Sequence, residues 1–356
     1  MNLKRVLLIA ALLPSLHARA DHPVPADSPD AYYEGRVATG EDHSVAMGFP
    51  GIVLHLHVRA ARVRAEVDVS GNAYFDLSVD GGPQRLIRLG EADHSIELLA
   101  SDTPGEHRIN LTRRTESWQG QCRVRGFRLD DAGELLSMSR PGVSLVFIGD
   151  SITCGAGTEI SPTGQMSDPV RSNGRNSFGR LIADRLGAEC FLVSYGGRGV
   201  FRDWQGIRAI ANAPVFYERT LPDDPTSRWD FSKNVPSVVC LCLGTNDFNQ
   251  GIPDENEFVN AYVEFVRKIQ RDAPNATVLL VDSPMTIDGV SPRHTTAVAY
   301  IEEVVQALRS PLVRHVRLMH VPGVPGDGHP TAADHVTIAD FLLPYFNEAL
   351  AKTPKS

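Results

Sequence analysis

Hydrophobic and polar residues alternate through much of the first third of the chain. Segments 52–58 and 63–69 contain strict alternation, and segment 73–79 continues the pattern up to the turn sequence Asp80-Gly81-Gly82. A period of two is typical of half-buried antiparallel strands, and an Asp-Gly pair favours a hairpin turn. Further short strands are expected at 84–89, 95–99, 105–112 and 122–129. The pattern therefore predicts an all-β domain over residues 21–140, a β-sandwich of the jelly-roll type.

After a polar link at residues 130–141, strand-like runs alternate with amphipathic helical segments. The strand-like runs lie at 144–148, 190–193, 237–243, 277–282 and 313–320. The helical segments lie at 177–186, 255–271, 295–308 and 333–351. Ser291-Pro292 supplies an N-terminal cap for the third of these helices. Such a series predicts a doubly wound α/β domain with a parallel sheet over residues 141–356.

The first twenty residues have the pattern of a secretory signal peptide. Lys4 and Arg5 precede a short apolar run at 6–13, and Ala18-Arg19-Ala20 is a small-x-small cleavage sequence. The apolar run is too short to span a bilayer, and no later run reaches that length. We therefore expect cleavage after Ala20, a secreted or periplasmic protein, and no membrane insertion.

Composition and charge narrow the classes of partner. The chain is 42% hydrophobic and 22% charged, as expected of a globular protein with a sizeable core. Its formal net charge is −8, and without residues 1–20 it would be about −11, with 32 basic and 43 acidic residues. No basic stripe with interleaved aromatic residues is present, so nucleic-acid binding is not expected. The sequence does not indicate a protein partner.

Five cysteines offer no obvious disulfide framework, and their odd number leaves at least one thiol without a partner. Cys240 and Cys242 alternate within a strand-like run, which favours small buried residues over a metal site. His55 and His57 share one face of a predicted strand. Partly buried or surface histidines are the favoured interpretation there, with a metal site as the alternative.

Four predicted strands end in residues that a reactive serine would need. Ser151 follows the first strand in Gly149-Asp150-Ser151, and Gly197 follows the second. Asn246 follows the third strand, and His329 follows the last. The carboxyl ends of parallel strands meet at one edge of the sheet. A serine nucleophile requires a base and donors for an oxyanion, and these four ends supply them together, although each motif alone is weak.

These four blocks resemble the Ser, Gly, Asn and His blocks of the SGNH (GDS-type) esterase superfamily. More narrowly, the chain resembles carbohydrate esterase family two, which places a jelly-roll domain before the SGNH domain. The run Arg113-Arg114-Thr115-Glu116 and the continuation 151–155 are also features of that family. The resemblance covers nearly all of the mature chain and implies a flavodoxin-like, three-layer hydrolase domain.

The resemblance implies roles for individual residues. Ser151 would be the nucleophile and His329 the general base. The backbone N–H groups of Ser151 and Gly197 and the side-chain amide of Asn246 would form the oxyanion hole. Asp327 would orient His329.

The spacing of the histidine block leaves an alternative for that last role. In the broad superfamily the aspartate stands three residues before the histidine, where this chain has Gly326. Asp327 stands two residues before His329, a spacing found in family two, where some members use a backbone carbonyl instead. Either group therefore remains a candidate to orient the imidazole.

Nearby residues are expected to support the site. Asp150 is expected to fix the serine turn by accepting backbone N–H bonds, and Asp247 to brace the loop that carries Asn246. Cys154 has no motif of its own and is expected to be a packed small residue. Trp118, Trp204, Trp229 and Tyr217 are candidates to line a sugar cleft, since segment 201–235 is long, weakly periodic and suited to a substrate wall.

Together these features predict an exported serine esterase that removes O-acetyl groups from carbohydrate. The resemblance implies acetylated polysaccharides such as xylan or glucomannan as substrates, with preference for the primary 6-position. The mechanism needs no cofactor or metal, and the sequence offers no P-loop or dinucleotide fingerprint. The alternatives are an SGNH lipase or thioesterase for longer acyl chains, and a non-catalytic carbohydrate-binding protein. Thr153 argues against a Gly-x-Ser-x-Gly hydrolase.

Overall fold

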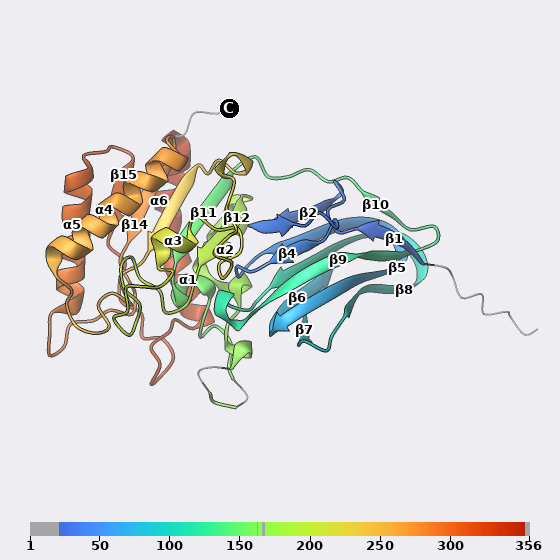
Figure 1. The fold of residues 1–356 in the computed structure, drawn as a ribbon, viewed down its shortest axis with the longest axis horizontal. Helices are drawn as coiled ribbons and strands as arrows, with labels where there is room; N and C mark the ends of the chain where they lie inside the picture. Colours follow the sequence, from blue (N-terminus) through green and yellow to red (C-terminus); the bar gives the residue numbers. More distant parts are fainter. Residues whose placement is uncertain (1–20, 162, 166–167, 353–356) are drawn as a thin grey trace, which may run out of the picture.

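The computed structural model describes residues 21–161, 163–165 and 168–352. An antiparallel sheet of ten strands and a parallel sheet of five strands lie side by side (Figure 1). The antiparallel strands are β1 (Asp21–Pro25), β2 (Ala31–Glu34), β3 (Val37–Thr39), β4 (Val45–Met47), β5 (Val53–Gly71), β6 (Ala73–Val79), β7 (Arg85–Leu89), β8 (Ser95–Arg113), β9 (Gly120–Asp130) and β10 (Glu134–Leu136). The predicted signal peptide lies outside the described residues.

Two long strands form the centre of the antiparallel sheet. The segments 52–58 and 63–69, expected as separate strands, belong to the 19-residue strand β5. The segments 95–99 and 105–112 likewise join into β8, also of 19 residues. The two strands pair with each other through register shifts near Ala60, which interrupt the ladder locally without ending it. The expectation of shorter strands was wrong because an irregularity in pairing looks like a strand end in the local pattern.

The second sheet is parallel throughout and has the order β12-β11-β13-β14-β15. Its strands are β11 (Ser144–Gly149), β12 (Glu189–Ser194), β13 (Val238–Cys242), β14 (Thr277–Val281) and β15 (Val313–Val316). Every residue of β11, β13 and β14 is buried. Strands covered on both faces read as continuous apolar runs, which explains the pattern in the sequence.

Helices cover both faces of this sheet. Buried residues of α2 (Phe178–Leu186) and α6 (Ala332–Lys352) share one apolar core with the sheet. Buried residues of α4 (Glu255–Asp272) and α5 (Arg293–Leu308) belong to the other core, which is continuous with that of the antiparallel sheet. The predicted doubly wound α/β fold, preceded by an antiparallel β domain, is confirmed.

Two local expectations need correction. No side chain caps α5 in the way predicted for Ser291: its carbonyl, not its hydroxyl, accepts a bond from Arg293 N–H. The carboxylate of Asp288 instead accepts from the N–H of Thr295 in the first turn. The predicted polar link at 130–141 contains the short strand β10, which pairs with β5.

The antiparallel domain covers one edge of the parallel sheet. Glu34 in β2 accepts a hydrogen bond from the backbone N–H of Cys190, with 2.6 Å between the atoms. Because β12 is the edge strand, this contact satisfies a backbone group that would otherwise be exposed. Glu34 also pairs with Arg180 in α2 at 2.5 Å and with His55 in β5 at 2.9 Å. His55 completes its bonding with Asn110 at 2.8 Å, which fits the structural interpretation of this histidine.

The described residues also bear on the expectations about cysteines, metal sites and membrane-spanning helices. All five cysteines are buried and unpaired. Within residues 21–352, apart from 162 and 166–167, no group of three or more His, Cys, Asp or Glu side chains could hold a metal ion. Among the described helices, none is both long and apolar enough to cross a membrane.

Candidate active site

Ser151 begins the four-residue helix α1 (Ser151–Cys154) at the carboxyl end of β11. Asp150 is the N-cap, and its carboxylate accepts a 3.0 Å bond from the N–H of Ile152. This is the turn-fixing bond expected of Asp150. It holds the serine at the point where the buried strand reverses into the helix.

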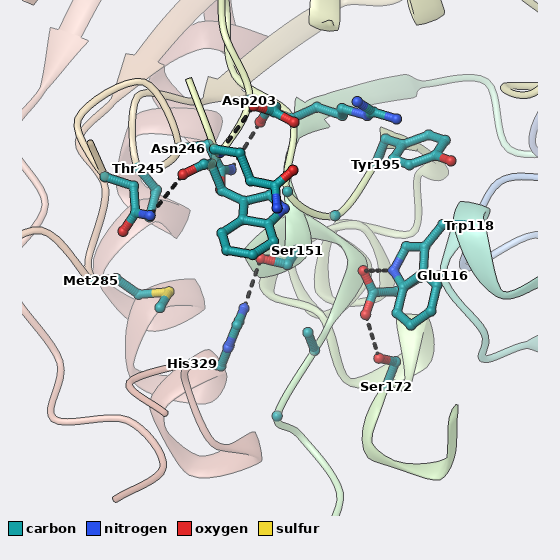
Figure 2. Close-up of a pocket in the computed structure, with 18 of the residues that line it drawn as sticks. Glu116, Trp118, Ser151, Ser172, Tyr195, Asp203, Thr245, Asn246, Met285 and His329 are labelled. Atoms are coloured by element: carbon teal, nitrogen blue, oxygen red, sulfur yellow. Dashed lines mark hydrogen bonds between the residues drawn. The ribbon is translucent and has the colours of Figure 1, made fainter. Parts of the chain in front are cut away.

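The serine, histidine and aspartate predicted from the sequence lie in hydrogen-bond contact. Figure 2 shows the bond between Ser151 and His329. His329 Nε2 is 2.8 Å from Ser151 Oγ, and His329 Nδ1 is 2.7 Å from Asp327 Oδ1. Asp327 and His329 both belong to the loop between β15 and α6. In this geometry the Asp327 carboxylate, rather than a backbone carbonyl, bonds to Nδ1 of the imidazole. A hydroxyl, an imidazole and a carboxylate in this order can activate the hydroxyl as a nucleophile.

Charges around the imidazole favour its protonation. Burial by itself would lower the pKa of His329, but the hydrogen bond and charge of Asp327 outweigh burial and, with the charges of Glu116 and Asp150, raise that pKa above its ordinary value. For Asp327, burial opposes ionisation, yet hydrogen bonds from His329 and Arg171 lower its pKa to about 2. The carboxylate therefore stays ionised, and an imidazolium formed beside it is stabilised.

Two backbone N–H groups of the cavity lining are available to an oxyanion. Neither Ser151 N–H nor Gly197 N–H donates to another group of the described residues. Gly197 has φ +77°, and a Cβ there would lie 2.9 Å from Cδ1 of Trp204, so the position requires glycine. Both residues line the same cavity.

Asn246 lies in the same cavity, but its amide is already engaged. Its Nδ2 donates to Asp150 Oδ2 at 3.0 Å and to the carbonyl oxygen of Arg198 at 2.9 Å. A side-chain amide has two N–H groups, so both are used here. Donation to a substrate would require Asn246 to share or exchange one of these bonds.

Asp247 connects the loops after β12 and β13. Its carboxylate accepts bonds from the backbone N–H groups of Val200, Phe201 and Arg202, at 2.9 to 3.2 Å. Those residues directly follow Gly199 in the loop that carries Gly197. The Asp247 carboxylate therefore ties that loop to the loop after β13, in which Asp247 lies. Burial raises the pKa of Asp247 to about 6 and that of the fully buried Asp150 to about 7.

The cavity above Ser151 has a volume of about 850 Å³ and two half-exposed indole rings in its lining, those of Trp118 and Trp204. The other two candidate aromatics lie elsewhere. The rings of Trp229 and Tyr217 flank the buried guanidinium of Arg36, whose carbon is 4.9 and 5.3 Å from their centroids. The structure therefore separates Trp118 and Trp204, which line the cavity, from the pair of aromatic residues that flanks Arg36.

Two family descriptions match the chain in succession. Residues 33–138 match the carbohydrate esterase 2 N-terminal model, and residues 147–343 match the GDSL-like lipase/acylhydrolase family. The acetylxylan esterase / glucomannan deacetylase of Cellvibrio japonicus (strain Ueda107) is 33% identical over 331 residues, which cover 92% of this chain and 91% of that protein. The chain belongs to carbohydrate esterase family two.

Solved structures of family-two esterases have the same architecture. The enzyme from Cellvibrio japonicus superposes with a TM-score of 0.89 at 32% identity, covering 93% of this chain and 98% of that one. The enzyme from Clostridium thermocellum, solved with cellohexaose, gives a TM-score of 0.83 at 27% identity, covering 90% and 99%. As a family-two esterase, the protein is a carboxylic ester hydrolase.

The cavity of this family-two esterase is also lined by residues that sequence reasoning did not assign to the site. Glu116 lies beside the 3-10 helix η1 (Ser117–Gln119) of the antiparallel domain and lines the cavity with Trp118. Its buried carboxylate accepts from Ser172 Oγ at 2.7 Å and from Trp118 Nε1 at 3.1 Å, as Figure 2 shows. Burial raises the pKa of Glu116. The run 113–116, a feature of the family that the sequence resembles, was the signal that could have pointed to Glu116.

No sequence motif had pointed to Arg171 as a residue of the site. It ends the 3-10 helix η2 (Pro169–Arg171) in an irregular segment, and its guanidinium forms an ion pair with Asp327. Cys154, by contrast, is the packed residue that was expected. It is fully buried, its Sγ lies 3.2 Å from Ser194 Oγ, and burial raises its pKa well above the ordinary value.

Proposed function

We propose that the protein is an exported serine esterase that removes O-acetyl groups from acetylated polysaccharide or oligosaccharide. One observation carries the proposal. The hydroxyl of Ser151 lies 2.8 Å from His329 Nε2 at the base of a cavity whose lining includes two exposed indole rings. The names of the family-two relatives support carbohydrate esters as the substrate class.

In the proposed reaction, Ser151 Oγ attacks the acetyl carbonyl while His329 Nε2 takes its proton. The tetrahedral oxyanion accepts bonds from the backbone N–H groups of Ser151 and Gly197 and from the amide of Asn246, which shares or exchanges one of its two present bonds. The imidazolium then protonates the departing sugar oxygen, and an acetyl-enzyme remains. Water, deprotonated by His329, hydrolyses the acetyl-enzyme, and acetate leaves as Ser151 regains its proton. Asp327 holds the imidazole through Nδ1 and stabilises its charged form.

The substrate side of the cavity supports a sugar. Trp118 and Trp204 are 47% and 51% exposed, and large apolar rings exposed in a cavity mark a binding surface. We propose acetylated xylan or glucomannan as the substrate, with preference for acetyl groups on the primary 6-position. The Clostridium thermocellum relative was solved with cellohexaose, a glucan chain, which supports a cavity that accepts β-linked sugars.

Acetate release from a panel of acetylated polysaccharides tests the proposal. The wild type should release acetate from xylan or glucomannan esters, and Ser151→Ala should reduce the rate by about a million-fold, to the background. Ser232→Ala, which removes an exposed hydroxyl far from the cavity, is the matched control. A preference for octanoyl over acetyl esters would indicate the lipase or thioesterase alternative. Failure of a fluorophosphonate probe to label the wild-type serine would favour a binding protein.

Export is part of the proposal and has its own test. Expression of the full chain in a bacterial host, followed by fractionation, should place the protein outside the cytoplasm. Sequencing of the mature N-terminus should give Asp21 as the first residue. A cytoplasmic protein that retains residues 1–20 would contradict export without affecting the proposed chemistry.

A further inference from the structure

Asp327 has a partner from another loop. It stands between Gly326 and Gly328, whose φ angles of 78° and 82° are left-handed, in a loop without regular structure. The side chain is only 4% exposed, and its two oxygens have different partners. Oδ1 bonds to His329 Nδ1 at 2.7 Å, and Oδ2 pairs with the guanidinium of Arg171.

We propose that Arg171 is a positioning residue, which orients the Asp327 carboxylate toward His329, and that the antiparallel domain holds Arg171 in place for this purpose. The proposal rests on the proposed serine chemistry of the same site. It also gives the antiparallel domain a part in catalysis, beyond covering the edge of the parallel sheet.

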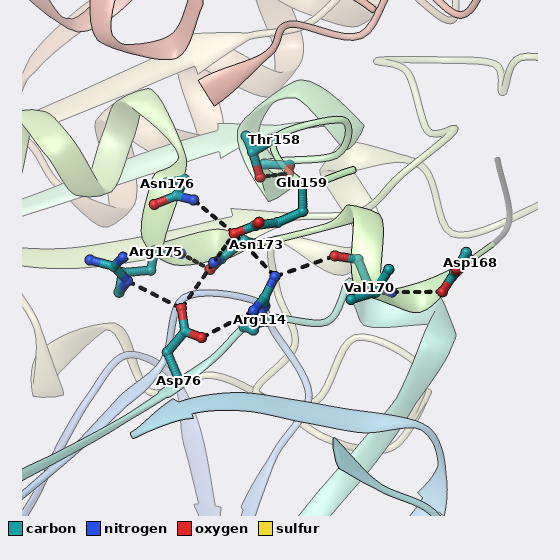
Figure 3. A network of polar contacts seen from close by, with 10 residues as sticks. Asp76, Arg114, Thr158, Glu159, Asp168, Val170, Asn173, Arg175 and Asn176 are labelled. Carbon is teal, nitrogen blue, oxygen red and sulfur yellow. Dashed lines mark hydrogen bonds and ion pairs between the residues drawn. The ribbon is translucent and has the colours of Figure 1, made fainter. Parts of the chain in front are cut away.

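The segment that carries Arg171 is held from both sides by the antiparallel domain. Arg114 Nη2 donates to the carbonyl oxygen of Val170 at 3.3 Å, on the residue before Arg171 (Figure 3). Glu116 accepts from the hydroxyl of Ser172 at 2.7 Å, on the residue after it. Arg114 and Glu116 of the antiparallel domain thus contact the residues on either side of Arg171.

A network of ion pairs fixes Arg114 itself. Its Nη1 bonds to Asp76 Oδ1 in β6 at 3.1 Å, and its Nη2 lies 3.1 Å from Glu159. Asp76 Oδ2 also accepts from Asn173 at 2.9 Å and pairs with Arg175 at 3.1 Å, as Figure 3 shows. Arg114 and Asp76 are buried, so the ion pair between them is shielded from solvent and helps to hold the loop in one arrangement.

Local contacts of Arg171 complete its placement. Its backbone N–H donates to the carbonyl of Asp168 at 3.0 Å, and its carbonyl accepts from Glu159 N–H at 3.1 Å. Its side chain is 10% exposed, so little solvent separates the guanidinium from Asp327. Apart from Arg171, the side-chain partner of this carboxylate among the described residues is His329 itself, so loss of Arg171 would leave the carboxylate freer to rotate away from the imidazole.

A mutant cycle with Asp327 tests the proposal. Arg171→Met should lower kcat by about 100-fold with little change in KM, since misplacing a catalytic group by an ångström costs about that much. In an Asp327→Asn background the same substitution should have almost no further effect, because no carboxylate remains to be oriented. Arg171→Lys should restore part of the lost kcat. Arg185→Met is the matched control, since it breaks an ion pair with Asp340 on α6 and belongs to neither the network around Arg114 nor the cavity lining.

Two readouts need no carbohydrate substrate and separate this proposal from the proposed function. The rate of Ser151 labelling by a fluorophosphonate should fall in Arg171→Met. The downfield proton resonance of His329 Nδ1–H should weaken or disappear. If the wild type cleaves no acetyl ester but these signals still depend on Arg171, the function fails and the positioning role stands.

Three results would overturn the positioning role. They are near-wild-type kcat in folded Arg171→Met, an equal loss with and without the Asp327 carboxylate, and an equal loss in Arg185→Met. If Arg171→Met does not fold, Ser172→Ala replaces it, because it keeps Arg171 and removes only the bond to Glu116. A several-fold loss of kcat that vanishes in the Asp327→Asn background supports the proposal, and an unchanged kcat contradicts it.

Discussion

The amide of Asn246 donates a 3.0 Å hydrogen bond to the carboxylate of Asp150, the residue that caps the helix of the nucleophile. The bond joins the ends of two neighbouring strands, β11 and β13. It fixes the distance between the turn that holds Ser151 and the loop that holds Asn246. The second N–H of the same amide donates to Arg198 in the glycine block, so Asn246 joins three of the four predicted blocks.

Replacing Asn246 with alanine should therefore slow the chemical step. We expect kcat for acetate release to fall by about 100- to 1,000-fold with a small change in KM, the loss typical of one oxyanion donor. Asn234→Ala is the control, because its Nδ2 bonds to Ser144 Oγ at the opposite end of β11. If Asn246 serves only to connect the loops, thermal stability would fall while kcat of the folded variant stays near the wild-type value.

The bond between Asp327 and His329 predicts a large catalytic effect of the carboxylate. Asp327→Ala should lower kcat by about four orders of magnitude, because the imidazole loses its orienting acceptor and its counter-charge. Asp340→Ala, which removes an exposed carboxylate on α6, should leave the rate unchanged. A loss of only a few-fold in Asp327→Ala would show that a backbone carbonyl suffices to hold His329.

Glu116 should control the pH dependence of the reaction. His329 must be neutral to act as a base, so kcat/KM falls as the pH drops through the pKa of His329, which lies above its ordinary value. Because the charge of Glu116 contributes to raising that pKa, Glu116→Gln should move the acid limb of the kcat/KM profile to lower pH. Glu106→Gln, at an exposed position of the antiparallel domain, should leave the limb in place. A shift of the acid limb to higher pH in Glu116→Gln would contradict the inference that the charge of Glu116 raises the pKa of His329.

His335 should make the fold less stable in acid. It is fully buried, its Nδ1 accepts from Phe178 N–H at 3.1 Å, and burial lowers its pKa to about 3. The unfolded chain binds a proton at an ordinary pKa of about 6.5 and the folded chain does not, so stability from this group is complete above pH 6.5 and declines toward pH 3.

The corresponding measurement compares urea unfolding of the wild type and His335→Asn at several pH values. Between pH 6.5 and 5 the wild type should lose about 2 kcal/mol through this group, and the variant should lack that part of the pH dependence. The variant should be less stable at neutral pH, since it loses the stacking of the imidazole on Phe178. His94→Asn, at an exposed position, should retain the wild-type slope. An unchanged slope in His335→Asn would show that this histidine is not the group that titrates.

The sequence by itself determined the fold class and the four blocks of the site. Buried parallel strands read as apolar runs, and the residues after them meet at one sheet edge whatever the detailed packing. For this reason Ser151, Gly197, Asn246 and His329 could be named before the structure was known. The resemblance of their blocks to one family narrowed the chemistry further.

Only the tertiary structure decided how the site is completed. Arg171 and Asp327 meet across 156 residues within the α/β domain. Glu116 and Ser172 are 56 residues apart and lie on different domains. Contacts of this kind depend on how the antiparallel domain docks against the parallel sheet, and local periodicity carries no information about docking. The same limit applies to Trp118 and Trp204, which line the cavity, and to Trp229 and Tyr217, which surround Arg36. The sequence placed Ser151 and His329 at one sheet edge, and the packing of two domains decided which side chains surround them.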